Sequence, residues 1–274
     1  MIFIEIMNQK KRVLSMMIKG INLGTHFLEN YTLGEYIDKG GNGKVYKVKR
    51  ICDGKIFTLK YLNDARTKEW NEKRKIRFKD EIQTLCNLSK IDNPYVMPLI
   101  DYNIFDDDLY WYIMPISKTI SEFFNDENIS IREKIFYFID IAKGIKSIHD
   151  LNYYHRDIEP NNILVVDNKV RLVDFGLVWH PSFEPCTNKE EKVGPAETIA
   201  PEMREDNPDL KHSSKADIYS FVKTIWMLLL GRSRAFVVQY SYETMDYLDC
   251  RMAILCDKGI KTFTRLNQLI MDGT

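Results

Sequence analysis

Residues 153–164 read YYHRDIEPNNIL and concentrate polar and charged side chains in a short stretch. These side chains belong to His155, Arg156, Asp157, Glu159, Asn161 and Asn162. Before the stretch, apolar residues recur every three or four positions from Ile131 to Ile148, which predicts a long helix. After it, NILVVDNKVRLV predicts two short strands joined by a tight turn at Asp167-Asn168. The stretch is therefore predicted to be a loop whose polar residues serve either as turn and cap residues or as a chemical site.

The first part of the chain has the pattern of β-structure. Strands are predicted at 31–37, 44–50 and 55–62, with Asp53-Gly54 as a hairpin signal, and a second pair at about 96–101 and 109–114. Between these groups, residues 68–89 predict a charged helix with one apolar face made by Ile76, Ile82, Leu85 and Leu88. Residues 1–30 show no firm pattern, and we interpret them as a flexible or dispensable arm.

From about residue 119 the pattern becomes helical. A β-rich lobe followed by an α-helical lobe predicts an α+β fold. The longest apolar run, TIWMLLL at 224–230, is too short to span a bilayer and predicts a buried helix.

Composition narrows the function classes. The chain has 274 residues, with 39 basic and 39 acidic side chains, so its net charge indicates neither a nucleic acid nor an anionic membrane as partner. Its five cysteines are scattered without a C-x-x-C pair, which favours reduced thiols over disulfides or a zinc site. The opening residues, MIFIEIMNQKKRV, contain too short an apolar run for a signal peptide. We therefore expect a cytoplasmic protein; the sequence does not specify its oligomeric state.

Several further motifs are ordinary when each is taken alone. A glycine cluster at 40–43 lets backbone amides approach phosphate oxygens, but it also fits a simple hairpin turn. Lys60 follows a short apolar run and Glu81 lies on the charged helix, and either is compatible with a surface position. Asp174-Phe175-Gly176 follows a predicted strand, and Ala200-Pro201-Glu202 comes further on. Their order and spacing make chance a poor explanation.

In this order the motifs resemble those of a eukaryotic-type protein kinase, over about residues 31–271. HRD, DFG and APE are literal, and the glycine cluster and the strand lysine lie where that family has them. The resemblance implies a two-lobed fold with an arm at 1–30, an N-lobe at 31–115 and a C-lobe at 116–274. The chain ends near the place where an arginine partner of Glu202 is expected, so either the C-lobe is truncated, another arginine substitutes, or that pair is absent.

The resemblance also implies ATP and Mg²⁺ as cofactors and a protein as substrate. Lys60 would hold the α- and β-phosphates and pair with Glu81, although Asp80 is an alternative partner. Asp157 would accept the substrate hydroxyl proton, and Asn162 and Asp174 would hold magnesium. Arg156 and Glu159 complete the expected catalytic set. The expected ATP-binding residues are Ile37, Gly40, Gly41, Asn42, Gly43, Val45, Thr58, Lys60, Met114, Ile116 and Leu164.

The sequence departs from the family pattern at several points. Asp38 replaces the first glycine of the phosphate loop, and Thr58 replaces a small alanine beside adenine. Glu159 stands where serine/threonine kinases have a lysine. A carboxylate about 5 Å from the transferring phosphoryl group, at an effective dielectric of about 20, would cost roughly 3 kcal/mol per unit charge. That is about a hundredfold in rate, so Glu159 is expected to point away, to pair with a base, or to slow the enzyme.

The departures leave the acceptor residue open. Pro195 replaces a threonine that accompanies the missing lysine, as in tyrosine kinases, whereas Pro160 follows the serine/threonine pattern. A serine/threonine acceptor is therefore slightly favoured, and tyrosine stays open. Glu191 in the loop before APE is predicted to substitute for an activating phosphate opposite Arg156; a solvated charged loop is the alternative interpretation. Three functions fit the sequence. The first is an active protein kinase, and the second is a pseudokinase that binds nucleotide as a scaffold. The third is a kinase-fold enzyme that transfers AMP or phosphorylates a small molecule. The composition favours a bacterial source.

Overall fold

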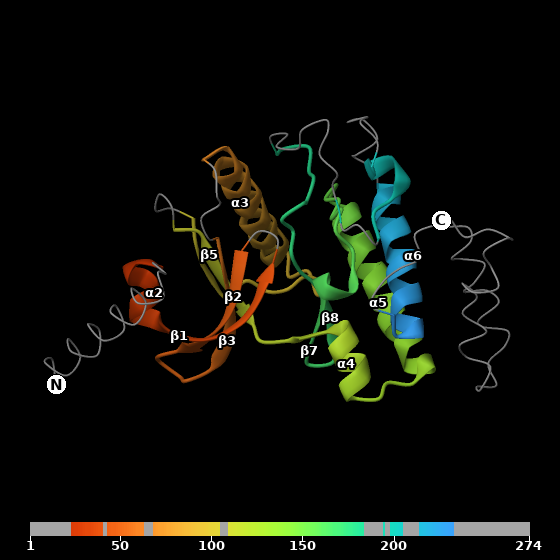
Figure 1. Ribbon diagram of the computed structural model, residues 1–274, viewed down its shortest axis with the longest axis horizontal. Coiled ribbons are helices and arrows are strands. Elements are labelled where there is room, and N and C mark those ends of the chain that lie inside the picture. Colours follow the sequence, from red (N-terminus) through yellow and green to blue (C-terminus); the bar gives the residue numbers. More distant parts are fainter. Residues whose placement is uncertain are drawn as a thin grey trace, which may run out of the picture. The chain divides into compact units, whose positions relative to one another are not determined.

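The computed structural model describes residues 23–40, 43–62, 68–104, 109–183, 194, 198–204 and 214–232 (Figure 1). They fall into two compact units. The first unit contains the described residues up to Asp92 together with Met97–Ser117, and the second contains Asn93–Val96 and those from Lys118 onward. An antiparallel sheet in the first unit and helices in the second confirm the predicted α+β class.

The first unit is built on a five-stranded antiparallel sheet with the order β1-β2-β3-β5-β4. The strands are β1 (Tyr31–Gly40), β2 (Gly43–Arg50), β3 (Ile56–Tyr61), β4 (Asp101–Asn103) and β5 (Trp111–Pro115). The turn between β2 and β3 contains Gly54 at φ +73°, a left-handed conformation that glycine adopts without steric cost, as the Asp53-Gly54 signal predicted.

Helix α3 (Lys68–Lys90) confirms the charged helix predicted at 68–89, but its buried face differs in one position. Ile76 is 37% exposed, whereas Phe78 is completely buried. Phe78 lies four residues before Ile82 and seven before Leu85, both of which are also buried. These three residues share one helical face, and Ile76 lies outside it.

Two sequence predictions for the first unit were wrong. No helix was predicted before Tyr31, yet α2 (Gly24–Asn30) packs on the sheet through Leu23 and Phe27. Strand β4 was predicted at about 96–101 but comprises Asp101–Asn103. Prolines 94 and 98 lie in or beside the predicted run and lack the N–H that a strand ladder requires, so regular pairing begins only after them.

The second unit combines three helices with a small antiparallel sheet of order β6-β7-β8. Its elements are β6 (Lys118–Thr119), α4 (Ile120–Asp126), α5 (Ile131–His149), the short 3₁₀ helix η1 (Pro160–Asn162), β7 (Ile163–Val166), β8 (Lys169–Leu172), the 3₁₀ helix η2 (Pro201–Arg204) and α6 (Ser214–Leu230). Capping boxes Thr119–Glu122 and Ser130–Glu133 begin α4 and α5, because each hydroxyl accepts from a free helical N–H. Helices α5 and α6 lie side by side (Figure 1).

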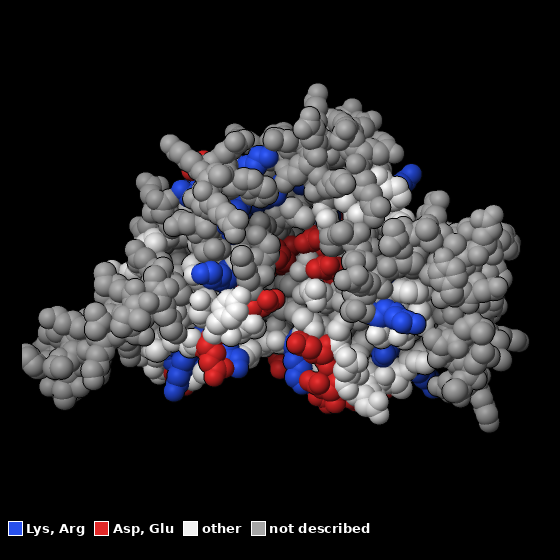
Figure 2. All heavy atoms as spheres, in the orientation of Figure 1, with Lys and Arg blue, Asp and Glu red and all other residues white. Residues whose placement is uncertain are grey.

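The β-hairpin after the HRD stretch is confirmed. Asp167 and Asn168 connect β7 to β8 with φ of +50° and +58°, the two left-handed residues that a tight hairpin turn requires. The run TIWMLLL forms the buried end of α6, as predicted. Within the described ranges, no helix is both long and apolar enough to cross a bilayer. On the face shown in Figure 2, acidic and basic side chains of the described residues are intermixed.

Candidate functional site

The first unit contains a buried ion pair between β3 and α3. The Lys60 ammonium contacts both carboxylate oxygens of Glu81, with Nζ–Oε1 at 2.8 Å and Nζ–Oε2 at 3.1 Å. Lys60 is 3% exposed and Glu81 is completely buried. The predicted pairing is therefore present, and Glu81 rather than Asp80 makes it. A buried pair of this kind is costly to form unless additional donors satisfy the carboxylate.

The glycine cluster occupies the end of the β1–β2 hairpin. Gly40 and Gly43 are paired across the two strands, while Gly41 and Asn42 lie outside the described residues. A Cβ on Gly43 would lie 2.6 Å from the carbonyl oxygen of Tyr61 on the neighbouring strand, so no larger residue fits there. Packing against β3 is thus sufficient to require glycine at position 43, whatever the loop binds.

Other residues expected to contact ATP lie on five strands and on the segment that follows β5. Thr58 on β3 is paired with Met114 on β5, and both are buried. Thr58, which replaces the family's small alanine, therefore lies on the interior of the sheet beside Met114. The remaining residues are the exposed Ile37 on β1, the half-buried Val45 on β2, the exposed Ile116 after β5, and the buried Leu164 on β7 of the second unit.

In the second unit, one buried carboxylate fixes the backbone of the HRD stretch. Asp217 on α6 accepts hydrogen bonds from the backbone N–H of His155 at 2.8 Å and of Arg156 at 2.7 Å. The ring of His149, at the end of α5, lies 2.8 Å from the same carboxylate. Arg156 has φ +61°, a conformation that is uncommon for a residue with a side chain. Strain of this kind persists where surrounding contacts hold it, and here Asp217 supplies them.

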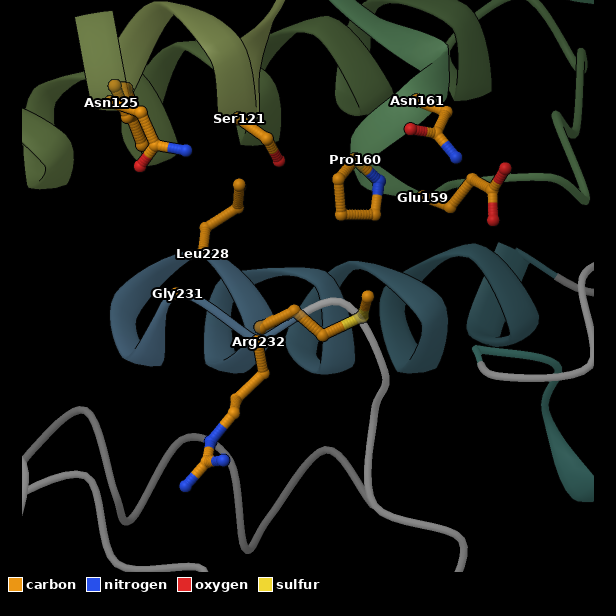
Figure 3. Close-up of a pocket in the computed structure, with 10 residues that line it drawn as sticks. Ser121, Asn125, Glu159, Pro160, Asn161, Leu228, Gly231 and Arg232 are labelled. Atoms are coloured by element: carbon orange, nitrogen blue, oxygen red, sulfur yellow. The ribbon is translucent and has the colours of Figure 1, made fainter.

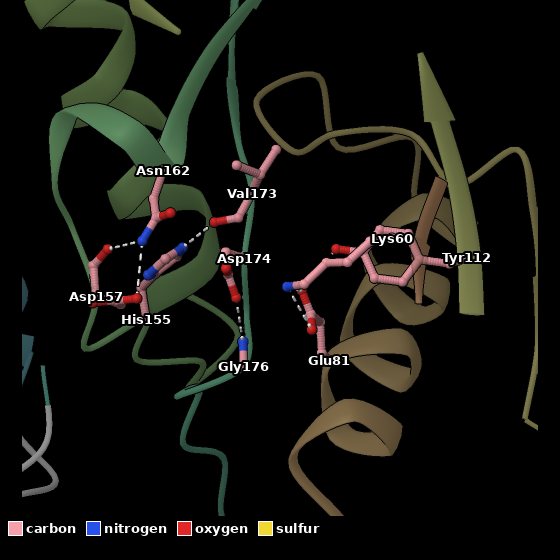
Figure 4. A network of polar contacts seen from close by, with 9 residues as sticks. All are labelled: Lys60, Glu81, Tyr112, His155, Asp157, Asn162, Val173, Asp174 and Gly176. Atoms are coloured by element: carbon pink, nitrogen blue, oxygen red, sulfur yellow. Dashed lines mark hydrogen bonds and ion pairs between the residues drawn. The ribbon is translucent and has the colours of Figure 1, made fainter. Parts of the chain in front are cut away.

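Asp157 and Asn162 form the contact that orients the loop. The Asn162 amide nitrogen donates to the Asp157 carboxylate and to its backbone carbonyl, each at 2.9 Å (Figure 4). Since the nitrogen of the amide faces Asp157, the amide oxygen is directed elsewhere. That orientation leaves a hard oxygen ligand for a cation.

Asp174 follows β8 and begins the DFG run. Its φ is +59°, and its carboxylate accepts from the backbone N–H of Gly176 at 3.3 Å (Figure 4). Asp174 and Arg156 are therefore both held in the left-handed region, one on each side of the β-hairpin. No group of three or more histidine, cysteine, aspartate or glutamate side chains placed to hold a metal occurs in the described part of the chain. A divalent ion at this site would depend on oxygens of Asn162, Asp174 and a bound ligand.

His155 is completely buried. Its Nε2 lies 2.9 Å from the backbone carbonyl of Val173, which fixes the tautomer with the proton on Nε2. Burial lowers the pKa of His155, and the nearby Asp217 only partly opposes that effect. The His155 ring packs on Phe175 with centroids 4.7 Å apart.

Glu159 lines a pocket of about 330 Å³ within the second unit (Figure 3). The pocket lies among α4, the loop at 159–161 and the end of α6, and its lining residues are Ser121, Phe124, Asn125, Glu159, Pro160, Asn161, Met227, Leu228, Gly231 and Arg232. Burial raises the pKa of Glu159, a hydrogen bond with the Asn161 side chain opposes this, and the negative charge of Asp174 adds to it.

Among the described residues, no basic side chain lies within ion-pair distance of Glu159. Of the three expectations for Glu159, pairing with a base is therefore not met among these residues. Four other predictions lie outside the described residues: Pro195, Glu191, the side chain of Glu202, and its possible arginine partners.

Sequence reasoning missed two contributors to these networks. Tyr112 donates its hydroxyl to Glu81 at 2.8 Å, and His149 contacts Asp217. Tyr112 could have been found from the pairing of β3 with β5, which places it opposite Lys60. His149 has no comparable signal, because its partner lies 68 positions away.

Comparison with known proteins gives a consistent result. The protein kinase domain family matches residues 31–265. Calcium-dependent protein kinase 4 of Plasmodium falciparum is 32% identical over 222 residues, which cover 77% of this chain and 39% of that protein. An Aurora kinase of Debaryomyces hansenii is 28% identical over 75% of this chain and 48% of its own length. A probable serine/threonine-protein kinase of Clostridium acetobutylicum is 26% identical over 77% of this chain and 31% of its own length. The chain spans less than half the length of each of these relatives.

Proposed function

The chain belongs to the protein kinase family, and we propose that it is an ATP-dependent kinase that transfers the γ-phosphate to a protein hydroxyl. The observation that carries this proposal is the formed pair between Lys60 and Glu81, with the ammonium and the carboxylate 2.8 Å apart and almost fully buried. Such a pair is a requirement for phosphoryl transfer in this family. A chain that no longer bound nucleotide phosphates would have no need to keep two charges buried in this costly arrangement.

Each polar residue has a defined task in the proposed reaction. Lys60 binds phosphate oxygens while Glu81 holds its ammonium in position. Asp157 orients the acceptor hydroxyl and takes its proton at a carboxylate oxygen. The hydrogen bond from Asn162 keeps the Asp157 carboxylate in one rotamer, and Asp217 keeps the backbone of the loop in place. Transfer then depends on positioning, since phosphoryl transfer needs little covalent assistance from the protein.

The residues present fit magnesium. Asn162 directs its amide nitrogen to Asp157, so its oxygen is available, and Asp174 supplies a carboxylate. Mg²⁺ prefers such hard oxygen ligands and usually binds through one or two of them together with substrate phosphates. When bound, the ion would neutralise phosphate charge.

A serine or threonine acceptor is favoured. The names of two relatives describe a calcium-dependent protein kinase and a probable serine/threonine-protein kinase, and Pro160 follows the serine/threonine pattern. Tyrosine stays open because Glu159 replaces the lysine of that pattern. Phosphoamino acid analysis of a labelled substrate distinguishes the three acceptors.

One observation favours a second function, a pseudokinase that binds nucleotide as a scaffold. Glu159 lies two residues after the proposed base, and burial together with Asp174 raises its pKa. A carboxylate there opposes the accumulation of phosphate charge. We give this function second place because Lys60, Asp157, Asn162 and Asp174 are all present.

The deciding experiment incubates the protein and a mixture of candidate substrates with ATP labelled at either the α- or the γ-phosphate, with and without Mg²⁺. Transfer of the γ-phosphate label to protein supports a protein kinase. Transfer of the α-phosphate label to protein indicates AMP transfer. Transfer of the γ-phosphate label to small molecules alone indicates a small-molecule kinase. Nucleotide binding with no transfer of either label supports the scaffold. We further expect a bacterial source and a cytoplasmic location, which fractionation of the native cells would test.

A further inference from the structure

Tyr112 is the third side chain of the buried Lys60–Glu81 pair. Its hydroxyl donates to Oε1 of Glu81 at 2.8 Å, the same oxygen that lies 2.8 Å from the Lys60 ammonium (Figure 4). Tyr112 is 2% exposed, so water does not compete for this hydrogen bond. Glu81 therefore has donors from two different strands.

The position of Tyr112 is fixed by the sheet and does not depend on the ion pair. Lys60 on β3 and Tyr112 on β5 are direct partners in an antiparallel ladder. Directly paired residues project from the same face of a sheet. The Lys60 ammonium accordingly lies 5.7 Å from the centre of the Tyr112 ring. The backbone register thus delivers the hydroxyl to Glu81 whether or not Lys60 is engaged there.

Tyr112 also contacts α3 through a second residue. The ring of Phe78, three positions before Glu81, lies 5.6 Å from the Tyr112 ring. Residues three apart project from the same side of a helix, so Phe78 and Glu81 both face Tyr112. One polar and one apolar contact therefore attach this turn of α3 to β5.

We propose that Tyr112 is a positioning residue that holds Glu81, and with it α3, in the arrangement that Lys60 requires. This inference rests on the proposed function, in which Lys60 also binds phosphate oxygens. An ammonium has three donors, and those directed to phosphate are lost to Glu81. A buried carboxylate with too few donors is unstable and tends to move toward water. The Tyr112 hydroxyl gives Glu81 a donor that nucleotide binding does not remove.

The expected effect of Tyr112→Phe follows from this role. Without the hydroxyl, conformers in which α3 has moved away from Lys60 gain population and bind ATP poorly. Saturating ATP restores the competent conformer by mass action. We therefore expect the KM for ATP to rise about tenfold while kcat changes less than about twofold, since a hydrogen bond to a charged group has this order of effect.

The test compares Tyr112→Phe with Tyr46→Phe. Tyr46 is also a buried tyrosine of the same sheet, but it packs against Tyr36 and Tyr61, away from the pair. Three quantities are measured for each full-length variant: the thermal midpoint, hydrogen exchange of α3 amides without nucleotide, and steady-state kcat and KM for ATP. We expect faster exchange around Glu81 and a higher KM in Tyr112→Phe only.

Hydrogen exchange keeps this inference separate from the proposed function. If the parent protein transfers no phosphate, the proposed function fails, and the exchange measurement still decides whether Tyr112 holds α3. Exchange in Tyr112→Phe equal to that of the parent would overturn the inference. So would an equal effect of Tyr46→Phe, or loss of folding in Tyr112→Phe at the assay temperature, because each would show a general stabilising role.

Discussion

The two units differ in how their acidic side chains are compensated: the first has a fully buried ion pair, and the second has three half-buried carboxylates near the HRD and DFG runs. In the first unit the Lys60 ammonium and the Glu81 carboxylate neutralise one another, and Tyr112 adds a further donor. In the second unit Asp157, Glu159 and Asp174 are all acidic, and the negative charge of Asp174 contributes to raising the pKa of Glu159. The ion pair of the first unit is electrostatically complete without a ligand, whereas the carboxylates of the second unit carry negative charge that a cation would neutralise.

This difference predicts which charged residues contribute to stability and which contribute to ligand binding. Removing one member of a compensated pair leaves an uncompensated charge and lowers stability. Removing one of several like charges relieves repulsion and need not lower stability at all. Stability measured without any ligand should therefore respond differently to charge removal in the two units. Activity measurements then test whether the carboxylates of the second unit take part in phosphate transfer.

The largest expected effect is on activity in the second unit. Asp157→Asn and Asp174→Asn keep the side-chain shape and remove one charge each, and asparagine tolerates the left-handed conformation of position 174. We expect each to lower γ-phosphate transfer by about 10³-fold or more, because one removes the base and the other a magnesium ligand. Asp140→Asn, at an exposed position on α5, is the control and should leave the rate unchanged. Transfer that persists in both variants would show that the assigned roles are wrong.

The next effect is on the stability of the first unit. Lys60→Met leaves the Glu81 carboxylate buried without its cation, and we expect the free energy of unfolding to fall by about 3 kcal/mol. Adding Glu81→Leu to that variant removes the uncompensated charge and should recover part of the loss. Chemical denaturation of the parent, both single variants and the double variant measures the coupling. Strictly additive losses would contradict a compensated pair.

A smaller effect is expected from reversing the charge at Glu159. Pairing of Glu159 with a base was one of the three expectations from the sequence, and if it held, Glu159→Lys would lower the rate. Since no base lies within ion-pair distance among the described residues, we now expect Glu159→Lys to raise the transfer rate by about tenfold, through attraction to phosphate and to Asp174. Glu127→Lys makes the same charge change at the exposed end of α4 and controls for net charge. An equal or lower rate in Glu159→Lys would restore the supporting role.

The smallest effect is a pH-dependent difference in stability. Burial raises the pKa of Glu159 above its ordinary value near 4.5, so the folded protein binds this proton more tightly than the unfolded chain. The resulting stability is complete below pH 4.5 and is lost as the pH rises through the folded pKa. The difference in stability between Glu159→Gln and the parent should therefore grow in favour of the variant as the pH rises from 4.5 to the folded pKa of Glu159. Above that pKa the difference should stay constant. Thermal midpoints measured from pH 4 to pH 8 check this, and a constant difference at every pH would refute it.

The residues that the sequence could predict are those whose chemistry is local or whose spacing is distinctive. The HRD stretch, the DFG run and the tight turn at Asp167-Asn168 could be identified because their residue types are dictated by chemistry or by left-handed backbone. The pairing of Lys60 with Glu81 could be predicted only through the family resemblance, since 21 positions separate the two residues.

The contacts that the sequence could not predict depend on the placement of neighbouring strands and helices. The role of Tyr112 depends on the register of β3 and β5, which places it opposite Lys60. The burial of Glu159 depends on α4 and the end of α6, which line the same pocket. Helix α2 has only a weak signal in the sequence: Leu23, Phe27 and Tyr31 recur at intervals of four and are all buried.

The docking of α2 has a consequence for how this domain is delimited. The family match begins at Tyr31, one residue after the helix ends. Phe27 contacts the ring of Trp111 edge-on, and the Trp111 indole N–H donates to the backbone carbonyl of Leu23 at 2.9 Å. A protein begun at Tyr31 would uncover the apolar surface of Trp111 and deprive its indole of an acceptor. Trp111 is the immediate neighbour of Tyr112 on β5, so the shortened protein would have a solvent-exposed defect one residue from the side chain that contacts Glu81.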